Sequence, residues 1–185
     1  MGLTKGLEKR GKDLLGGVNK VYLFPYTKYS RSQITISGQY VTVFPATTVY
    51  DYHSTTTNYS ESTEVEGGDI AFNQSFTLEF PKTEAVSEIY KLVKQNFRAI
   101  YIDYLGNIRI LGLWNGLEAT LENTTGSDKA GFNGYKINFT GKESSQALWI
   151  NNLSDTGITI YSINNYIFQN GCNYVFQNGD NFIYN

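Results

Sequence analysis

The sequence contains one cysteine, Cys172, and one histidine, His53. A single cysteine cannot form a disulfide within the chain, so disulfide-stapled secreted scaffolds are excluded. Without a second histidine, catalysis by a Cys–His or Ser–His pair has no supporting pattern, and a zinc site lacks enough ligands. No glycine-rich phosphate loop stands between a predicted strand and a predicted helix. We therefore expect no enzyme, no metal and no cofactor.

Charged residues and long apolar runs are also scarce. Charged residues make up 17% of the chain, below the quarter or so that is usual for soluble domains. No stretch approaches the roughly 20 apolar residues of a membrane span, and the first residues lack the apolar run of a signal peptide. We expect a soluble protein of a reducing compartment that does not insert into membranes.

The net charge of −2 argues against a generally basic nucleic-acid binder. The charge is uneven, however, because residues 1–20 hold five basic side chains against two acidic ones, a balance of +3. These are Lys5, Lys9, Arg10, Lys12 and Lys20 against Glu8 and Asp13. The segment is predicted to be a basic arm that is solvated or contacts another subunit, with nucleic-acid contact as the alternative.

What the sequence does have is aromatic and β-branched residues, led by 15 Tyr and 11 Phe. Such residues fit a pleated surface, so the fold class is predicted to be mainly β. Alternating or apolar runs predict strands at 21–24, 33–37, 40–44, 47–52, 70–80, 97–104, 107–113, 114–123 and 135–140. The body is predicted to span residues 21–150, with 1–20 as an arm and 151–185 as a C-terminal assembly element.

One helix is predicted at residues 83–95, with Thr83 as its N-cap. Val86, Ile89, Tyr90 and Val93 fall at helical spacing and predict one apolar stripe that packs on a sheet from outside. Before it, the polar run 53–68 predicts a long protruding hairpin arm over residues 48–70, with flexible disorder as the alternative. Such an arm is expected to become ordered against a partner.

The C-terminal third repeats itself with a period of eight residues. Asn-Tyr-Ile-Phe-Gln-Asn-Gly-Cys at 165–172 recurs as Asn-Tyr-Val-Phe-Gln-Asn-Gly-Asp at 173–180, and a third copy begins at 181. Asn-Gly favours a two-residue type I′ turn, which predicts a three-stranded meander at 164–169, 172–177 and 180–185. That register places Tyr166 opposite Val175 and Gln169 opposite Cys172.

Both faces of this predicted meander are apolar, and its outer strand has an open edge. Tyr166, Phe168, Val175, Phe182 and Tyr184 share one face, and Ile167, Cys172, Tyr174, Phe176 and Ile183 share the other. A two-sided sheet of this size is expected to dock on a neighbour or add strands to another subunit's sheet; coverage within one fold is the alternative. The candidate assembly contacts are Tyr166, Phe168, Tyr174, Phe176, Phe182, Tyr184 and Tyr59.

Three other chemistries receive weak support. The acidic residues Glu61, Glu64, Glu66 and Asp69 match no calcium-loop spacing, so a solvated acidic loop is favoured. Nothing singles out a glycosidase pair of carboxylates. Trp114 and Trp149 are interpreted as core or interface anchors, with sugar-stacking platforms as the alternative.

The strand at 135–143, Tyr-Lys-Ile-Asn-Phe-Thr-Gly-Lys-Glu, resembles the last body strand of bacteriophage tail proteins, particularly of phages that infect Bacteroidota. Residues 14–23 (Leu-Leu-Gly-Gly-Val-Asn-Lys-Val-Tyr-Leu), 101–107 (Tyr-Ile-Asp-Tyr-Leu-Gly-Asn) and the Phe-Gln-Asn-Gly repeats look similar too. The likeness covers roughly residues 14–145. It implies a tail-tube-like β-sandwich or barrel with a flanking helix, and six or so copies in a ring whose joined sheets surround passing DNA.

The leading expectation is therefore a non-enzymatic virion protein of a phage tail, assembled in the host cytoplasm as a homo-oligomeric ring, which the resemblance implies to be hexameric. Its partners would be neighbouring tail or connector proteins and DNA in non-specific transit. The C-terminal meander exceeds a minimal tube subunit, which favours a hub, terminator or adaptor. The alternative is a carbohydrate-binding β-sandwich module of a receptor-binding appendage.

Overall fold

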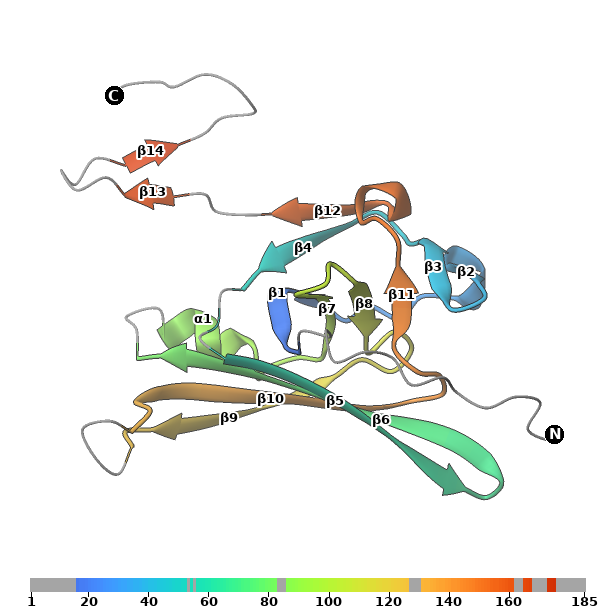
Figure 1. The fold of residues 1–185 in the computed structure, drawn as a ribbon, viewed down its shortest axis with the longest axis horizontal. Helices are drawn as coiled ribbons and strands as arrows, with labels where there is room; N and C mark the ends of the chain where they lie inside the picture. Colours follow the sequence, from blue (N-terminus) through green and yellow to red (C-terminus); the bar gives the residue numbers. More distant parts are fainter. Residues whose placement is uncertain are drawn as a thin grey trace.

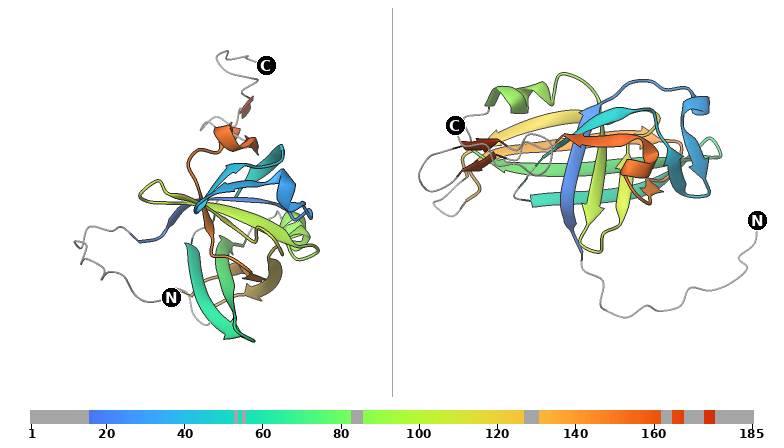
Figure 2. Two further views of the ribbon diagram at one scale, coloured as in Figure 1. Left: turned by 90° about the vertical axis from the view of Figure 1, so that its right-hand side faces the viewer. Right: turned by 90° about the horizontal axis from the view of Figure 1, so that it is seen from above.

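The computed structural model describes residues 16–52, 54, 56–82, 86–126, 131–161, 165–167 and 173–175. Its body consists of two β-sheets packed face to face, with one short helix among the described residues. Neither sheet closes into a hydrogen-bonded barrel, so the architecture is an open β-sandwich. The predicted mainly-β class is confirmed. Figures 1 and 2 show the strands of the two sheets running across one another.

The larger sheet has eight strands in the order β12-β4-β1-β7-β8-β11-β3-β2. Their bounds are β1 Val18–Pro25, β2 Thr35–Ser37, β3 Tyr40–Val43, β4 Thr47–Asp51, β7 Phe97–Asp103, β8 Ile108–Leu111, β11 Leu148–Ile150 and β12 Ile158–Tyr161. Two pairings are parallel, β11 with β3 and β12 with β4. The sheet curls strongly, because β3 and β4 follow each other in sequence but lie near its opposite ends. Consistent with this, Phe44 N–H donates to Thr156 O at 2.9 Å.

The smaller sheet has four antiparallel strands in the order β5-β6-β10-β9. They are β5 Thr56–Glu66, β6 Asp69–Pro81, β9 Glu118–Thr124 and β10 Gly134–Glu143. β5 and β6 form a long hairpin whose two-residue turn is Gly67-Gly68, both with positive φ. Glycine adopts that conformation without strain, which explains why the chain reverses there.

The hairpin predicted over 48–70 is wrong in its bounds: the observed hairpin joins β5 and β6 over residues 56–81, and most of it is not a free arm. Residues 48–51 belong to β4 in the other sheet, and β5 pairs with β6 from Thr56 to Glu66. β10 covers β6 as far as Phe72, so only the end of the hairpin extends beyond its neighbour. The Thr- and Ser-rich composition reflects a strand with one solvent-facing side rather than a loop.

Two hydrophobic cores hold the fold together. The first fills the space between the sheets and includes Leu23, Phe76, Leu78, Ile137 and Phe139, none of which is accessible to solvent. The second lies inside the curl of the eight-stranded sheet and includes Phe24, Val49, Ile100, Ile110 and Ile158. Because the central strands of the curled sheet contact both cores, the residues of β7 are buried along most of its length.

The helix α1 spans Val86–Lys91, which is shorter than the predicted 83–95; Thr83 lies outside the described residues. The predicted stripe is wrong at Tyr90, which is 45% exposed, whereas Leu92 is buried. The cause is a tightened end: Leu92 N–H donates to Ile89 O, a three-residue spacing that turns Leu92 inward beside Ile89. Both residues join the core between the sheets, so α1 closes one side of that core.

Residues 151–161 belong to the body, although the sequence placed them in the C-terminal element. Leu153, Thr156 and Ile158 are buried around the 3-10 helix Ser154–Thr156, and β12 pairs with β4. Another 3-10 helix, Arg31–Gln33, precedes β2. About 110 residues separate β12 from its partner β4 in the sequence, so no local pattern predicts this pairing.

After β12, β13 (Asn165–Ile167) and β14 (Asn173–Val175) form a separate antiparallel pair. The predicted register is wrong by one residue, because Tyr166 lies opposite Tyr174 rather than Val175. Five residues therefore separate the paired ends Ile167 and Asn173, which does not fit the two-residue turn that the prediction assumed. The third predicted strand lies outside the described residues.

Candidate functional site: the outer face of the four-stranded sheet

The outer face of the four-stranded sheet consists mostly of hydroxyl and amide side chains, with charged side chains among them. Alternation puts every second residue of β5, β6, β9 and β10 on this face, and the registers align them in rows across the strands. One row consists of Asn58, Thr77, Asn138 and Thr120, and the next of Ser60, Ser75, Thr140 and Glu118. Within the first row, Thr77 Oγ1 donates to Asn138 Oδ1 at 2.9 Å.

The charges of this face are mainly carboxylates. In the described part of the face, five acidic side chains, Glu64, Asp69, Glu79, Glu118 and Glu122, accompany two lysines, Lys136 and Lys142. Each lysine lies near an acid of the same face, Lys136 Nζ at 3.7 Å from Glu79 and Lys142 Nζ at 3.4 Å from Glu64. Among the described residues no ion pair joins Glu118 or Glu122, both on β9. The face is therefore negative along its β9 border.

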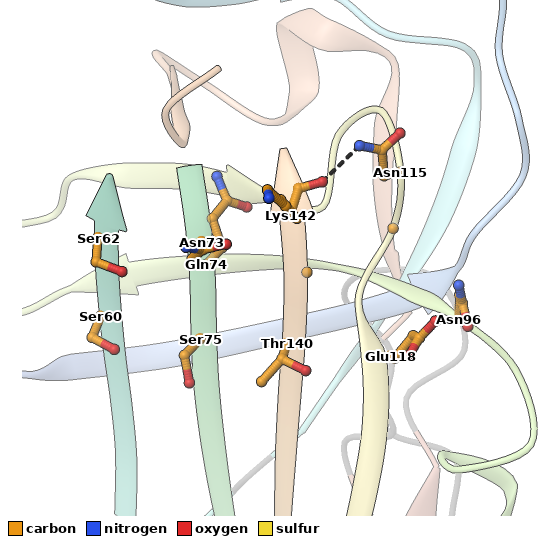
Figure 3. Close-up of a pocket in the computed structure, with 12 residues that line it drawn as sticks. Ser60, Ser62, Asn73, Gln74, Ser75, Asn96, Asn115, Glu118, Thr140 and Lys142 are labelled. Atoms are coloured by element: carbon orange, nitrogen blue, oxygen red, sulfur yellow. Dashed lines mark hydrogen bonds between the residues drawn. The ribbon is translucent and has the colours of Figure 1, made fainter. Parts of the chain in front are cut away.

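A shallow groove of about 500 Å³ crosses one end of the face (Figure 3). Its lining comes from all four strands and from two neighbouring loops: Ser60, Ser62, Asn73, Gln74, Ser75, Asn96, Asn115, Gly116, Glu118, Thr140, Gly141 and Lys142. No aromatic side chain contributes to this lining. The groove thus offers hydrogen-bonding groups without a stacking surface.

Both borders of the sheet are open in the part of the chain that the structure describes. β5 is hydrogen-bonded only to β6, and β9 only to β10. An open strand border presents unpaired N–H and C=O groups that can pair with another strand. The two borders are opposite ends of one sheet, so a β9-to-β5 contact between copies would be head-to-tail.

Beneath the groove, the end of β10 is fastened to the loop between β8 and β9. The buried carboxylate of Glu143 accepts hydrogen bonds from the N–H groups of Asn115 at 2.8 Å and Trp114 at 3.1 Å. Asn115 Nδ2 donates to Lys142 O at 2.6 Å. Burial raises the pKa of Glu143, while these N–H groups and the Arg98 charge act in the opposite direction.

Arg98 is buried on the opposite side of the same loop. Its Nε donates to Leu113 O at 3.0 Å and Nη2 to Thr27 O at 2.7 Å. The guanidinium lies 4.4 Å from the Tyr26 ring centroid and 4.8 Å from that of Tyr29, so aromatic faces replace part of its hydration. Burial lowers the pKa of Arg98, with Tyr26, Tyr29 and Glu143 acting in the opposite direction.

A second polar connection joins the two sheets through Glu61 and Gln74. Glu61 Oε2 accepts from Ala147 N–H at 2.8 Å, from Gln74 Nε2 at 3.1 Å and from the Tyr59 hydroxyl at 2.9 Å. Buried Gln74 in turn accepts from Gly112 N–H at 2.9 Å. Burial and the neighbouring Glu61 charge raise the pKa of Tyr59, and burial raises that of Tyr101 to about 12.

Sequence reasoning missed the inward positions of Glu61, Gln74 and Glu143, and its interpretation of Glu61 as part of a solvated loop is wrong, because Glu61 accepts three hydrogen bonds within the fold. A signal for these positions was nevertheless present. Each stands in phase with apolar, inward-facing positions of its own strand: Glu61 with Tyr59, Gln74 with Phe76, and Glu143 with Phe139. A polar residue at an inward position needs hydrogen-bond partners, so the alternation itself marks these three residues.

The structure locates few of the sequence-predicted assembly contacts. Tyr166 and Tyr174 are register partners in the β13–β14 pair, and Phe168, Phe176, Phe182 and Tyr184 lie outside the described residues. Tyr59 is partly buried, and its ring lies 4.9 Å from that of Tyr101. Tyr59 therefore packs between the two sheets rather than at a free surface.

The weaker chemistries gain no support from the geometry. Glu61 points into the hydrogen-bond network and Glu64 lies beside Lys142, so these acids do not converge on one ion. No group of metal-binding side chains occurs among the described residues, and no helix there is long and apolar enough to cross a membrane. Comparison with known proteins found no matching family model, curated sequence or solved structure.

Proposed function

We propose that this chain is a structural subunit of a phage tail that assembles into a ring, with its four-stranded sheet facing the DNA channel. The observation that carries the proposal is the outer face of that sheet, with its rows of hydroxyl and amide groups and its carboxylates on β9. The resemblance of the 135–143 strand to tail proteins gives the biological setting. The protein is a conduit rather than an enzyme.

The face suits a channel because it gives DNA phosphates nothing strong to hold. Phosphate contacts from free lysines and arginines supply most non-specific DNA affinity. Here both lysines of the face lie beside carboxylates, and Glu118 and Glu122 repel phosphate. Small uncharged side chains such as Ser60, Ser75 and Thr140 leave the surface smooth and hydrated.

The open borders suit a ring because they allow one sheet to continue into the next. Joining β9 of one copy to β5 of another would extend the rows of hydroxyl groups on the outer side. On the inner side, it would place Ala119 and Leu121 beside Tyr59, and these three side chains already pack against the inner core. A head-to-tail contact of this kind closes into a ring when its rotation divides the circle.

The carbohydrate-binding alternative receives no support from the two tryptophans. The Arg109 guanidinium lies 3.7 Å from the Trp149 ring centroid, and that of Arg31 lies 5.5 Å from the Trp114 ring. Each indole thus already has a cation on one face. The polar groove, moreover, has no aromatic lining, so we do not carry this alternative further.

The mass of the full-length protein in solution tests the ring. Size exclusion coupled to light scattering, followed by electron microscopy of the fractions, is expected to give a closed multiple of the 20.9 kDa chain or stacked tubes. A monomer at every concentration, both alone and on DNA of any length, would contradict the ring.

Reversing the charge of β9 tests which face lines the channel. We expect the double variant Glu118→Lys, Glu122→Lys to form the same ring and to retain DNA with strong salt dependence, because two lysines per subunit now meet phosphates. The matched control is the double variant Glu88→Lys, Asp155→Lys, which makes the same change of charge at two exposed acids away from the face. Equal DNA retention by the two variants would show that the sheet does not face DNA.

A further inference from the structure

The free border of β12 is the least protected strand border in the eight-stranded sheet. β12 ends the strand order, with β4 on one side and no described strand on the other. Its sequence, Ile-Thr-Ile-Tyr, contains no lysine, proline or bulge. Natural proteins usually block such borders with those devices, so an unblocked one indicates a border that is filled.

An apolar side chain of β12 is left exposed beside this border. Ile158 and Ile160 lie on the same side of the strand, inside the curl. Ile158 is 4% exposed, whereas Ile160 is 40% exposed. On the other side, Tyr161 packs against Tyr50 with ring centroids 5.6 Å apart, and both rings remain about half exposed. An added strand would cover Ile160.

A groove accompanies this border. It measures about 510 Å³ and is lined by Ile158, Thr159 and Ile160 together with Leu153 and Ile108. Successive residues of a strand point to opposite faces, so a groove that touches three in a row runs along the strand's border. The lining is largely apolar and carries no charged side chain.

The chain itself contains a strand donor of fitting size. Twenty-four residues, 162–185, follow β12, and they hold the three repeats Asn-Tyr-Ile-Phe, Asn-Tyr-Val-Phe and Asn-Phe-Ile-Tyr. Each four-residue unit matches the four residues of β12 in length and alternates apolar side chains on both faces. The tail has one charged residue, Asp180, and no proline.

Among the described residues, no strand pairs with the outer border of β12. Within the chain, β13 pairs with β14 and not with β12, although only three residues separate β12 from β13. We propose that the C-terminal repeat segment of a second copy of this chain adds a strand to the border of β12 and places an apolar side chain in the Ile158–Ile160 groove. Backbone pairing supplies affinity and the groove supplies specificity. This inference concerns the other sheet and does not rest on the proposed channel.

Disulfide trapping between two full-length chains tests the proposal. The acceptor chain carries Cys172→Ser and Ile160→Cys. The donor chains carry an affinity tag, Cys172→Ser and one cysteine at the centre of a repeat: Ile167→Cys, Val175→Cys or Ile183→Cys. A disulfide requires Cα atoms within about 7 Å, so it reports strands that lie side by side. We expect at least one donor to form a tagged–untagged pair with the acceptor.

The matched control is an acceptor with Tyr90→Cys in place of Ile160→Cys, because Tyr90 is exposed to a similar degree but lies on α1. A trapping yield at least tenfold higher at position 160 than at position 90 would support the proposal. Equal yields at positions 160 and 90 with every donor would overturn it. Trapping solely within single chains that carry both Ile160→Cys and a donor cysteine would overturn the assignment to a second copy. None of these outcomes depends on ring size or on DNA.

Discussion

Glu143 and Asn115 are joined twice over: the Glu143 carboxylate accepts the Asn115 N–H, and the Asn115 side chain donates to the carbonyl next to Glu143. This contact fixes the end of β10 against the loop between β8 and β9. The last two residues of the motif at 135–143, Lys142 and Glu143, are thus the residues that attach the strand to that loop. The same loop borders the polar groove, so the groove's shape depends on the fastening.

Replacing Glu143 by Gln is expected to destabilise the protein by about 1–3 kcal/mol at pH 7. A glutamine amide has one acceptor oxygen and would direct an N–H₂ group at backbone donors, leaving at least one buried N–H unsatisfied. Urea unfolding followed by tryptophan fluorescence measures the effect. Lys142→Gln, at the exposed neighbouring position, is expected to change stability by no more than about 0.5 kcal/mol. Equal effects would contradict the role of Glu143.

The stability difference between the wild-type chain and Glu143→Gln is expected to depend on pH. Burial raises the pKa of Glu143 above its ordinary value of 4.5, so the folded state holds the proton more tightly than the unfolded state. This contribution is complete below pH 4.5 and is lost as pH rises through the folded-state pKa. The variant should therefore lose more stability at pH 4 than at pH 7. A difference independent of pH would refute the raised pKa.

Gly141→Ala is expected to destabilise the fold by about 1–3 kcal/mol through overpacking. A Cβ at Gly141 would lie 2.6 Å from Gly116 O and 2.9 Å from Leu117 Cδ2, closer than atoms can approach. The backbone of β10 passes directly under the loop, and only glycine leaves room. Gly16→Ala is the control, because no atom lies within 4 Å of its added Cβ. Thermal unfolding of both variants decides whether the contact is this tight.

Truncation is expected to place the end of the body at residue 161. A chain ending at residue 161 should keep cooperative unfolding, because all of β12 remains. A chain ending at residue 150 loses the buried side chains of Leu153 and Ile158, and with them about 3–6 kcal/mol. Circular dichroism with urea titration compares the two. Equal stability would restore the body boundary at 150 that the sequence suggested.

Elements with local signals were predictable from the sequence. The β7–β8 hairpin and the strand at 135–140 lie where alternation places them, whereas the Gly67-Gly68 turn lies near the end of the predicted 48–70 arm rather than at its centre. The helix end was not predictable, because the tightened turn that buries Leu92 depends on contacts with the core. Likewise, the parallel pairing of β12 with β4 depends on closing a long loop, which leaves no trace in local sequence.

The candidate functional surface was likewise only partly predictable from the sequence. The sequence showed the polar run at 53–68. That this run forms one border of a polar sheet face could be recognised only from its register with β6. Arg98 lies in a run of buried residues. The three aromatic rings that surround its guanidinium come from distant segments, so the local sequence does not predict them.

The pairing of β12 with β4 also sets when the protein can fold. Thr47 lies beside Ile158, so the eight-stranded sheet lacks β12 until residues 158–161 have been made. Contacts between such distant segments form slowly, because the loop between them must close first. Until then, Val49 and the rest of β4 present an uncovered border to other chains in the cell. The eight-stranded sheet can therefore be completed only after residue 161 has been synthesised.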